Sequence, residues 1–469
     1  MKGFTFLTTE EVVKVHDATL QILENIGVSS SSEKFKELLL SNGCKEDNGR
    51  IKLPADIVNK FLQKAPSTFK MRRRDDEPDL EIGARIGYSQ ICSGTPHVLD
   101  LETGKRRSYR LKDLEDLTRL GDALPNIDIV SCGVPTDVDE HGYMTTEVAT
   151  MLRNTSKPAR VPIESTVELP YIKELLALIA GGMDEFRENP FLYLEVSPLS
   201  PLDFAGLPAD AIIELAQAGI PTGLIPCNMM GATGPMSLIG AVAQQNAEVV
   251  TGIVAAQMVN PGLPVIMSPR VTFIDMKSGA GLWAAPEVGL AGACSIQLAQ
   301  HYNIPVSVSA FSVASKVPDQ QSGYERCFNY ICATLAGCDI YAAAGSLDNA
   351  LIACFGQLVI DSEIASMGKR ITRKIEVTDE ALAVDVVAEV VNSKSSFLEQ
   401  KHTRKFLRAG ELWAPQISDR STFAHWNEKG ESIAQKARNT AADLLKTREP
   451  IMEPAAEKEI DRIIQSARK

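Results

Sequence analysis

The side chains of this chain that could take part in chemistry are few in number. Its 469 residues include only six histidines, and its nine cysteines are scattered. No C-x-x-C pair and no closely spaced pair of histidine and cysteine occurs, although zinc sites usually need such pairs. We therefore expect no metal site. Four carboxylates stand where acid–base chemistry could use them, namely Glu164, Glu195, Asp319 and Asp348.

Two further features suggest specific chemistries, and each has an ordinary alternative. Lys316 follows an apolar run, where a lysine could form a Schiff base, although a surface or structural lysine is more common. The glycine-rich segment 228–235 ends in Pro235, which suits the first position of a helix whose N-terminus could attract an anion. Its spacing matches neither a P-loop nor a dinucleotide fingerprint. A tight turn explains Gly231 and Gly234 at least as well.

The middle of the chain alternates between strand-like and helical segments that would position these side chains. Short apolar runs are followed by loops and helical patterns, which is typical of a parallel sheet covered on both faces. The runs occupy residues 86–92, 127–132, 160–163, 191–196, 222–225, 264–267, 305–308 and 339–342. Eight such units predict a closed (β/α)8 TIM barrel of the α/β class. An open doubly wound sheet is the alternative, but the number of units and the lack of a strong dinucleotide fingerprint argue against it.

The two ends of the chain are helical and predict extensions of the barrel. We expect an N-terminal helical extension with short strands over residues 1–84, the barrel over 85–370, and a C-terminal helical extension over 371–469. In such a barrel the active site lies at the carboxyl ends of the strands. The residues that follow the apolar runs are therefore candidates for the site, among them His97, Glu195, Asn228, Arg270, Phe311, Asp348 and Asn349.

Composition argues against several classes of function. The chain has 48 basic and 60 acidic residues and a formal charge of −12, so we expect no nucleic-acid partner. No uncharged apolar run is long enough to span a membrane, and Glu10 and Glu11 would interrupt a signal peptide. The scattered cysteines suit a reducing cytoplasm. A symmetric homo-oligomer is the default expectation for a cytoplasmic enzyme of this size.

A set of motifs along the chain resembles the trimethylamine methyltransferase family. They are GATGP at 231–235, AVAQQNAE at 241–248, QMVNPGLPV at 257–265, SKVPDQQSGYE at 315–325 and GQLVIDSE at 356–363. Together they are specific, and the resemblance runs from the N-terminal helices to about Gln435. It implies a (β/α)8 barrel that moves a methyl group from a methylated amine to the cobalt of a corrinoid (cobalamin) cofactor. That cofactor would be supplied by a separate, cognate corrinoid protein.

One departure from the family pattern bears on the substrate. Trimethylamine enzymes of the family carry pyrrolysine in a loop that resembles residues 345–350, and the matching position here is Asn349, an ordinary residue. The resemblance then implies a quaternary amine, with glycine betaine first and proline betaine, carnitine, choline and γ-butyrobetaine open. A quaternary ammonium already carries its charge and leaves as a neutral amine. No general acid is then needed, which fits the scarcity of histidine.

The resemblance also suggests roles for the candidate residues. The site must hold the methyl group in a near-attack geometry, bind a cation without N–H donors and, for a betaine, bind a carboxylate. The catalytic candidates are Asp348, Asn349 and Glu195. The substrate-binding candidates are the aromatic residues Phe311 and Phe355 and the donors Arg270, His97 and Asn228. Gly231 and Gly234 would leave room for the corrinoid to approach.

Two other functions remain open from the sequence alone. The first is a Schiff-base lyase on the same barrel, with Lys316 as the nucleophile. The second is a barrel without catalytic activity that only binds a methylated amine or a corrinoid protein.

Overall fold

The N-terminal extension consists of short helices and hairpins that pack beneath and beside the rest of the protein. The computed structural model describes residues 5–447, 451–452 and 454–469. The first helix starts at a capping box, in which the Thr8 hydroxyl accepts a hydrogen bond from the Glu11 amide and the Glu11 carboxylate accepts one from the Thr8 amide. The elements are α1 (Thr9–Gln21), η1 (Ile22–Ile26), β1 (Ser29–Ser30), α2 (Glu33–Ser41), β2 (Lys45–Asp47), β3 (Arg50–Lys52), α3 (Ala55–Leu62), β4 (Phe69–Met71) and β5 (Leu80–Ile82).

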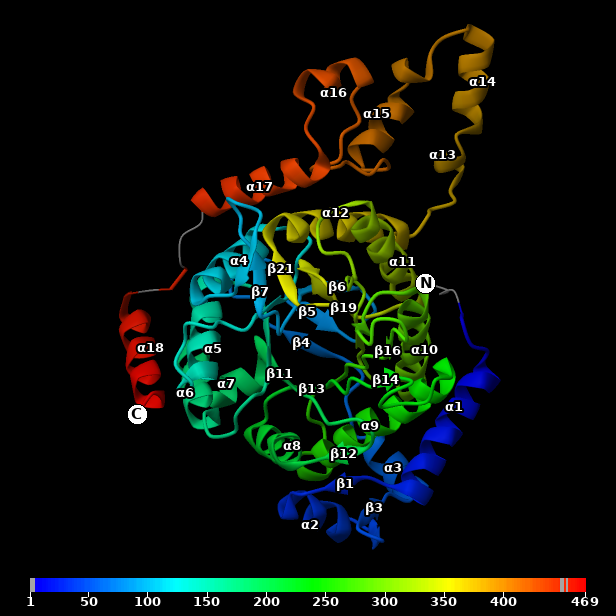
Figure 1. Cartoon of the computed structure of the whole chain (residues 1–469). Helices are drawn as coiled ribbons and strands as arrows, with labels where there is room; N and C mark the ends of the chain where they lie inside the picture. Colours follow the sequence, from blue (N-terminus) through cyan, green and yellow to red (C-terminus); the bar gives the residue numbers. More distant parts are fainter. Residues whose placement is uncertain (1–4, 448–450, 453) are drawn as a thin grey trace.

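Within the described residues, eight parallel strands close into a barrel (Figure 1). They are β6 (Tyr88–Ile91), β9 (Val130–Ser131), β10 (Ala159–Pro162), β11 (Leu192–Val196), β13 (Thr222–Leu224), β15 (Val265–Met267), β18 (Ser307–Val308) and β19 (Ile340–Ala344). Pairing runs β9-β10-β11-β13-β15 and β18-β19-β6, and the parallel bridges Gln90–Ile129 and Met267–Val306 join the two groups into a ring. Each predicted apolar run overlaps one of these strands, so the predicted TIM barrel is confirmed.

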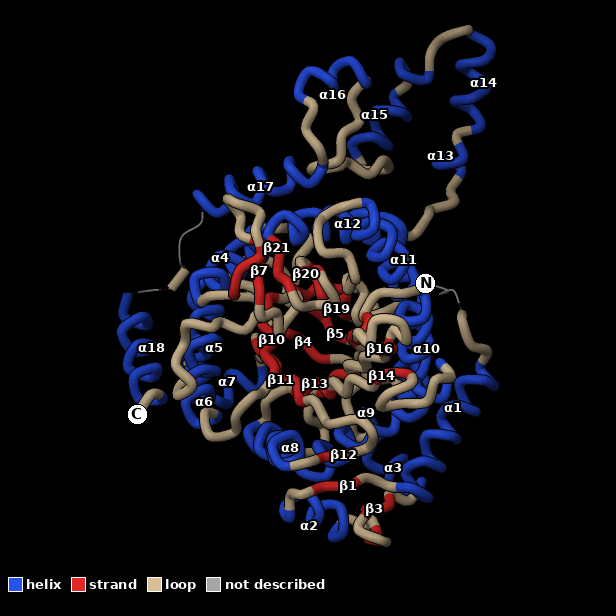
Figure 2. Tube along the Cα trace, in the orientation of Figure 1, coloured by secondary structure: helices blue, strands red, loops and turns tan. Residues whose placement is uncertain are grey.

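One helix of each βα unit covers the outside of the barrel, and Figure 2 shows the strands gathered inside this ring. These helices are α4 (Leu111–Ala123), α5 (Tyr143–Asn154), α6 (Leu169–Ala180), α8 (Gly206–Ala218), α9 (Leu238–Val259), α10 (Pro286–Tyr302), α11 (Gln320–Ala336) and α12 (Phe355–Thr372). The short helix α7 (Met183–Glu188) follows α6. No helix of the part that the structure describes is both long and apolar enough to cross a membrane.

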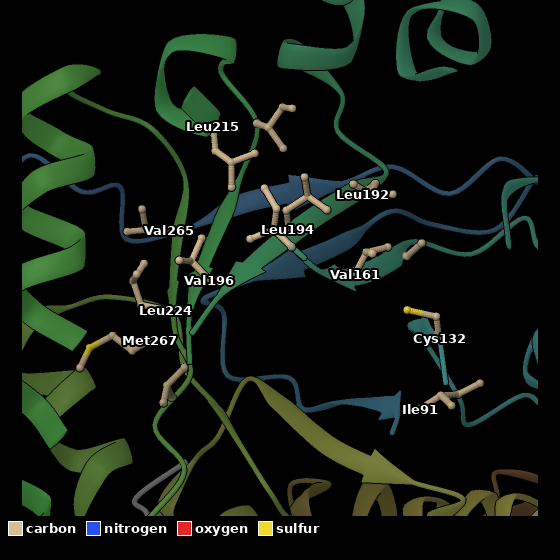
Figure 3. Packing of buried hydrophobic residues seen from close by; sticks show 14 of the residues in the cluster. Ile91, Cys132, Val161, Leu192, Leu194, Val196, Leu215, Leu224, Val265 and Met267 are labelled. Carbon is tan, nitrogen blue, oxygen red and sulfur yellow. The ribbon is translucent and has the colours of Figure 1, made fainter. Parts of the chain in front are cut away.

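Side chains alternate along each barrel strand between two separate hydrophobic clusters, one outside the barrel and one inside it. Leu192, Leu194 and Val196 of β11 belong to the large core between the strands and the helices (Figure 3). Tyr193 belongs instead to a cluster with the β4–β5 hairpin, which closes the amino end of the barrel through residues such as Met71. Because successive side chains of a strand point to opposite faces, Glu195 must also point into the barrel.

Short strands in the βα loops build up the opposite, carboxyl end of the barrel. Two small sheets lie there, β20-β21-β7-β8 and β14-β16-β17, and a further strand pairs with β1. Their strands are β7 (His97–Leu99), β8 (Arg106–Ser108), β12 (Asp203–Phe204), β14 (Met229–Met230), β16 (Thr272–Ile274), β17 (Gly281–Leu282), β20 (Ser346–Leu347) and β21 (Ile352–Cys354).

The C-terminal part leaves the barrel after α12 and returns to it later. Residues 373–430 form an arm whose helices project away from the barrel (Figure 1), while the amides of residues 416–418 donate hydrogen bonds to Glu363 of α12. The arm contains α13 (Asp379–Leu382), α14 (Val384–Ser393), η2 (Phe397–Glu399), α15 (Lys401–Arg408) and α16 (Phe423–Lys429). The chain then packs back on the barrel, with α17 (Ile433–Thr447) against α12 and α4, and α18 (Pro454–Ala467) against α6 and α5.

Candidate active site

A cavity of about 260 Å³ lies inside the barrel at the carboxyl ends of the strands. Its wall includes Gln90 of β6, Arg160 of β10 and Arg270, which follows β15. Trp283 and Asn349 complete it from two of the loops. This is the end of a TIM barrel where active sites are found.

Two buried guanidinium groups and one carboxylate give this cavity its charge. Arg160 and Glu195 lie on neighbouring strands and form an ion pair whose side chains are almost completely buried. The Ser268 hydroxyl donates a second hydrogen bond to the Glu195 carboxylate, at 2.7 Å. Arg270 donates to the carbonyl and hydroxyl oxygens of Ser307, at 2.6 and 2.9 Å. The group therefore carries two positive charges and one negative charge.

Arg160 keeps hydrogen-bonding capacity that the protein does not use. Its Nε and Nη1 atoms are buried and have no hydrogen-bond partner among the described residues. Burial lowers the pKa of Arg160 and of Arg270, but the ordinary pKa of arginine is so high that both remain charged. A buried, charged donor without a partner is costly. The cavity is therefore suited to an anionic group such as a carboxylate, which pairs well with guanidinium.

The loop after β19 carries Asn349 over the cavity in an unusual backbone conformation. Asp348, Asn349 and Ala350 are three consecutive residues with positive φ, between 50° and 65°. The Asn349 side-chain carbonyl accepts a hydrogen bond from the Trp283 amide at 3.1 Å. The backbone amide of Asn349 donates to the Val313 carbonyl at 2.7 Å. Non-glycine residues rarely adopt this left-handed backbone conformation. Three of them in succession keep it only where the surrounding structure imposes it, and such strain is typical of functional sites.

A buried ion pair beneath the loop holds the residues that come just before this segment. Arg326 of α11 and Asp361 of α12 are both fully buried and lie 3.2 Å apart. Arg326 donates to the carbonyls of Phe311 and Ser346, and Asp361 accepts from the Gly345 amide at 2.6 Å. Two helices thus hold the ends of the β18 and β19 loops in fixed positions.

The other residues predicted for substrate binding do not line this cavity. Phe311 is fully buried and packs against Tyr330, with ring centroids 4.9 Å apart. Phe355 lies in the core as the first residue of α12. His97 lies on β7 and contacts Arg106 at 3.0 Å. Asn228 is buried and donates to the Ala241 carbonyl at 2.8 Å.

The remaining candidates lie on the loops that follow β18 and β13. Lys316 is about two-thirds exposed, and its ammonium group lies 3.4 Å from the Asp348 carboxylate. The segment around Gly231 and Gly234 is a compact turn: the amides of residues 232–234 all donate to the Met229 carbonyl. Gly231 has a φ of 84°, which only glycine adopts easily. The turn uses its amides internally, so it offers no cradle for a phosphate.

Candidate metal ligands do not cluster. Among the residues that the structure describes, no three His, Cys, Asp or Glu side chains lie close enough together to hold a metal ion.

Sequence reasoning missed Arg160, Gln90 and Tyr193 as residues of the barrel interior. The Tyr193 hydroxyl donates to the Gln90 side-chain carbonyl at 2.5 Å. A signal was present, because Arg160 is a charged residue inside an otherwise apolar strand. A buried charge in such a place needs a partner or a function.

Comparison with known proteins agrees with this architecture. The family model described as trimethylamine methyltransferase (MTTB) matches residues 1–469. The chain is 31% identical to trimethylamine methyltransferase MttB of Desulfitobacterium hafniense (strain DSM 10664 / DCB-2), with 97% of this chain and 92% of that protein covered. It is 30% identical to the glycine betaine methyltransferase of D. hafniense (strain Y51), with 99% and 96% covered.

A solved structure shows the same fold at low identity. The monomethylamine methyltransferase (MtmB) of Methanosarcina barkeri superposes with a TM-score of 0.56 at 13% identity, covering 96% of this chain and 90% of that chain.

Proposed function

The chain belongs to the trimethylamine methyltransferase (MTTB) family and acts on methylated amines, and we propose that its substrate is a quaternary amine with a carboxylate, glycine betaine first. The methyl acceptor in this proposal is the Co(I) corrinoid of a partner corrinoid protein. The observation that carries the substrate assignment is the pair of buried guanidinium groups in the barrel cavity, where Arg160 has two unpartnered nitrogen atoms.

The carboxylate of the substrate binds between Arg160 and Arg270. It supplies acceptors for the free Arg160 N–H groups, and it brings the charge of the group formed by Arg160, Arg270 and Glu195 from +1 to zero. Glu195 acts here as a positioning residue, because its carboxylate already binds Arg160 and Ser268. A substrate without a carboxylate, such as trimethylamine or choline, would leave the excess positive charge uncompensated.

The ammonium end of the substrate points toward the open end of the cavity. Trp283 is the one aromatic residue in the wall of the cavity that the structure describes, and in this proposal its ring contacts the methylated cation. We assign this contact to Trp283 because Phe311 and Phe355 are buried in the core. Asn349 holds the Trp283 backbone through its side chain, so Asn349 and the adjoining Asp348 shape the rim rather than donate protons.

The residues of the cavity suit a reaction without acid–base catalysis. The leaving group departs as a neutral amine, so the protein has to orient the N–CH3 bond toward the mouth and exclude water. The corrinoid of the partner protein, when bound, supplies the nucleophile for the methyl group. A cavity of about 260 Å³ holds a small amine but no macrocycle, so the corrinoid has to stay outside, near the turn that contains Gly231 and Gly234.

The decisive experiment compares methyl donors with and without a carboxylate. The enzyme is assayed with Co(I) cobalamin and with glycine betaine, choline or trimethylamine, and the formation of methyl-Co(III) is followed by absorbance. We expect kcat/KM for glycine betaine to exceed that for choline by on the order of 100-fold, the value of a charge-assisted bidentate contact. Equal rates with choline, or a preference for trimethylamine, would refute the assignment.

The variant Arg270→Gln tests the same contact from the protein side. Arg270 binds only neutral groups, so its removal leaves no ion without a partner. We expect the advantage of glycine betaine over choline to fall about tenfold or more, while the rate with choline changes little. An unchanged ratio would show that the carboxylate binds elsewhere.

A further inference from the structure

A tyrosine and a glutamine form a buried hydrogen-bonded pair beside the cavity, and the proposed function uses neither of them. Tyr193 of β11 belongs to the apolar cluster that closes the amino end of the barrel, and its side chain is fully buried. Its hydroxyl donates a hydrogen bond to the Gln90 side-chain carbonyl of β6 at 2.5 Å. Gln90 is 2% exposed and is part of the cavity wall, as Arg160 and Arg270 are. The pair therefore connects the apolar end of the barrel with the proposed substrate site.

The hydrogen bond determines which end of the Gln90 amide is available to a ligand. A primary amide carries an accepting oxygen and a donating amino group. Tyr193 occupies the oxygen, so the Nε2 amino group is the end that remains. Burial raises the pKa of Tyr193 to about 12, so at neutral pH its hydroxyl keeps the proton that it donates. Turning the amide over would leave this proton without its acceptor inside an apolar cluster, which costs free energy. Tyr193 thus holds Gln90 as a hydrogen-bond donor.

A neutral donor has a specific use beside the two arginines. A carboxylate offers about four positions to hydrogen-bond donors, whereas the buried Arg160 atoms without a partner are Nε and Nη1. The group formed by Arg160, Arg270 and Glu195 carries one net positive charge, which a single carboxylate neutralises. Gln90 can therefore add a hydrogen bond to that carboxylate without adding a charge that would stay uncompensated.

We propose that Gln90 binds the carboxylate of the substrate through its Nε2 amino group and that Tyr193 is the positioning residue that orients this amide. This role of Gln90 rests on the proposed function, because it takes a betaine as the methyl donor. An arginine attracts any anion, whereas an amide fixed by a second residue donates in one direction. The contact therefore restrains the substrate at its carboxylate, and with it the direction of the N–CH3 bond toward the mouth of the barrel.

The variant Gln90→Glu tests the donor with almost no change of shape. Its carboxylate can still accept the Tyr193 hydrogen bond, but it offers the ligand an oxygen and a negative charge in place of N–H. We expect the ratio of kcat/KM for glycine betaine to that for choline to fall by on the order of 100-fold, because a donor is lost and like charges meet. The rate with choline, a cation without a carboxylate, should stay the same or rise. Circular dichroism and the melting temperature establish that the variant is folded.

A double-mutant cycle tests the role of Tyr193. Tyr193→Phe should raise KM for glycine betaine roughly three- to tenfold, since the released amide turns over part of the time, and KM for choline should change little. Within the Gln90→Leu variant, Tyr193→Phe should have no further effect on the preference for glycine betaine, because Tyr193 acts through Gln90. Tyr302→Phe is the matched control. The Tyr302 hydroxyl also bonds to an amide, that of Asn246 at 2.7 Å, but it does so on α10 at the outside of the barrel, so its loss should leave the preference unchanged.

Direct binding separates this role of Gln90 from the proposed function. Isothermal titration calorimetry without a corrinoid should show that Gln90→Glu raises the dissociation constant of glycine betaine by on the order of 100-fold. A wild type that does not prefer glycine betaine over choline would overturn the proposed function and the role of Gln90 together. A preference that is present in the wild type and fully kept by Gln90→Glu would overturn the role of Gln90 alone. Equal effects of Tyr193→Phe with and without Gln90 would do the same for the role of Tyr193.

Discussion

At the scale of single residues, the barrel interior concentrates charge where the sequence pattern shows only apolar strands. Arg160 and Glu195 both take inward positions on strands whose outward neighbours, such as Val161 and Leu194, pack under the helices. An ion pair of this kind costs desolvation free energy that its mutual attraction repays only with good additional hydrogen bonds. Ser268 supplies one to Glu195, while Arg160 has donors left over. We interpret these unpaired donors of Arg160 as the binding site of a ligand carboxylate.

A second buried carboxylate leads to a prediction about pH. Glu147 of α5 is 1% exposed, and burial raises its pKa well above the ordinary value, with the nearby Glu164 carboxylate raising it further. At pH values between the pKa of Glu147 in the unfolded chain and its higher pKa in the folded protein, Glu147 has lost its proton only in the unfolded chain. The free energy of unfolding therefore falls as pH rises above about 4.5.

The variant Glu147→Gln removes this titration but keeps the shape of the side chain. We expect it to match the wild type in urea unfolding near pH 4.5 and to become the more stable protein as pH rises to 8. The difference at pH 8 should be on the order of 1–3 kcal/mol. A difference that does not change with pH would show that Glu147 is ionised in the folded state.

At the scale of elements, glycines decide how closely helices approach the strands. Gly252 lies on α9, and a Cβ atom there would lie 2.8 Å from Leu224 Cγ of β13. Gly292 lies on α10, and a Cβ atom there would make ordinary contacts of 3.6–3.8 Å with Val308 of β18. Both glycines lie within helices, but only Gly292 leaves room for a Cβ atom.

Alanine at these two glycines should therefore have opposite effects. Gly252→Ala should lower the free energy of unfolding by about 1–3 kcal/mol through overpacking. Gly292→Ala should raise it by about 0.5–1 kcal/mol through helix propensity. Urea unfolding of both variants measures the difference, and two changes of the same sign would contradict the close packing of α9.

The same elements explain how much the sequence could predict. The eight barrel strands were predictable because each one is a short apolar run, with one face buried under the outer helices and the other inside the barrel. The side-chain roles were harder. Phe311 stands just beyond a strand end, but the position of an aromatic residue along the chain does not tell whether it faces the cavity or the core. Arg160 was overlooked because a strand of three or four residues shows its inward positions only through pairing with its neighbours.

At the scale of the whole molecule, the mouth of the barrel is apolar at its rim although the cavity is charged. Six of the βα loops each present one exposed apolar side chain around this end. They are Val167, Leu199, Met236, Met276, Val317 and Leu351, with exposures between 47% and 81%. An apolar ring around a polar centre is the usual composition of a docking surface for another protein. If the proposed function is right, the corrinoid protein is the partner that has to reach this mouth.

Charges placed on the rim should therefore separate two reactions that share the same cavity. We expect Met236→Asp/Met276→Asp to lower kcat/KM for methyl transfer to the corrinoid protein by about tenfold or more, because two buried apolar contacts are lost. The rate with free Co(I) cobalamin should stay close to that of the wild type, since neither side chain binds the substrate in this proposal. Ile86→Asp is the matched control, because Ile86 is 50% exposed just before β6, at the amino end of the barrel. Equal losses with both acceptors would mean that the substitutions disturb the cavity, and no loss with either would place the partner elsewhere on the molecule.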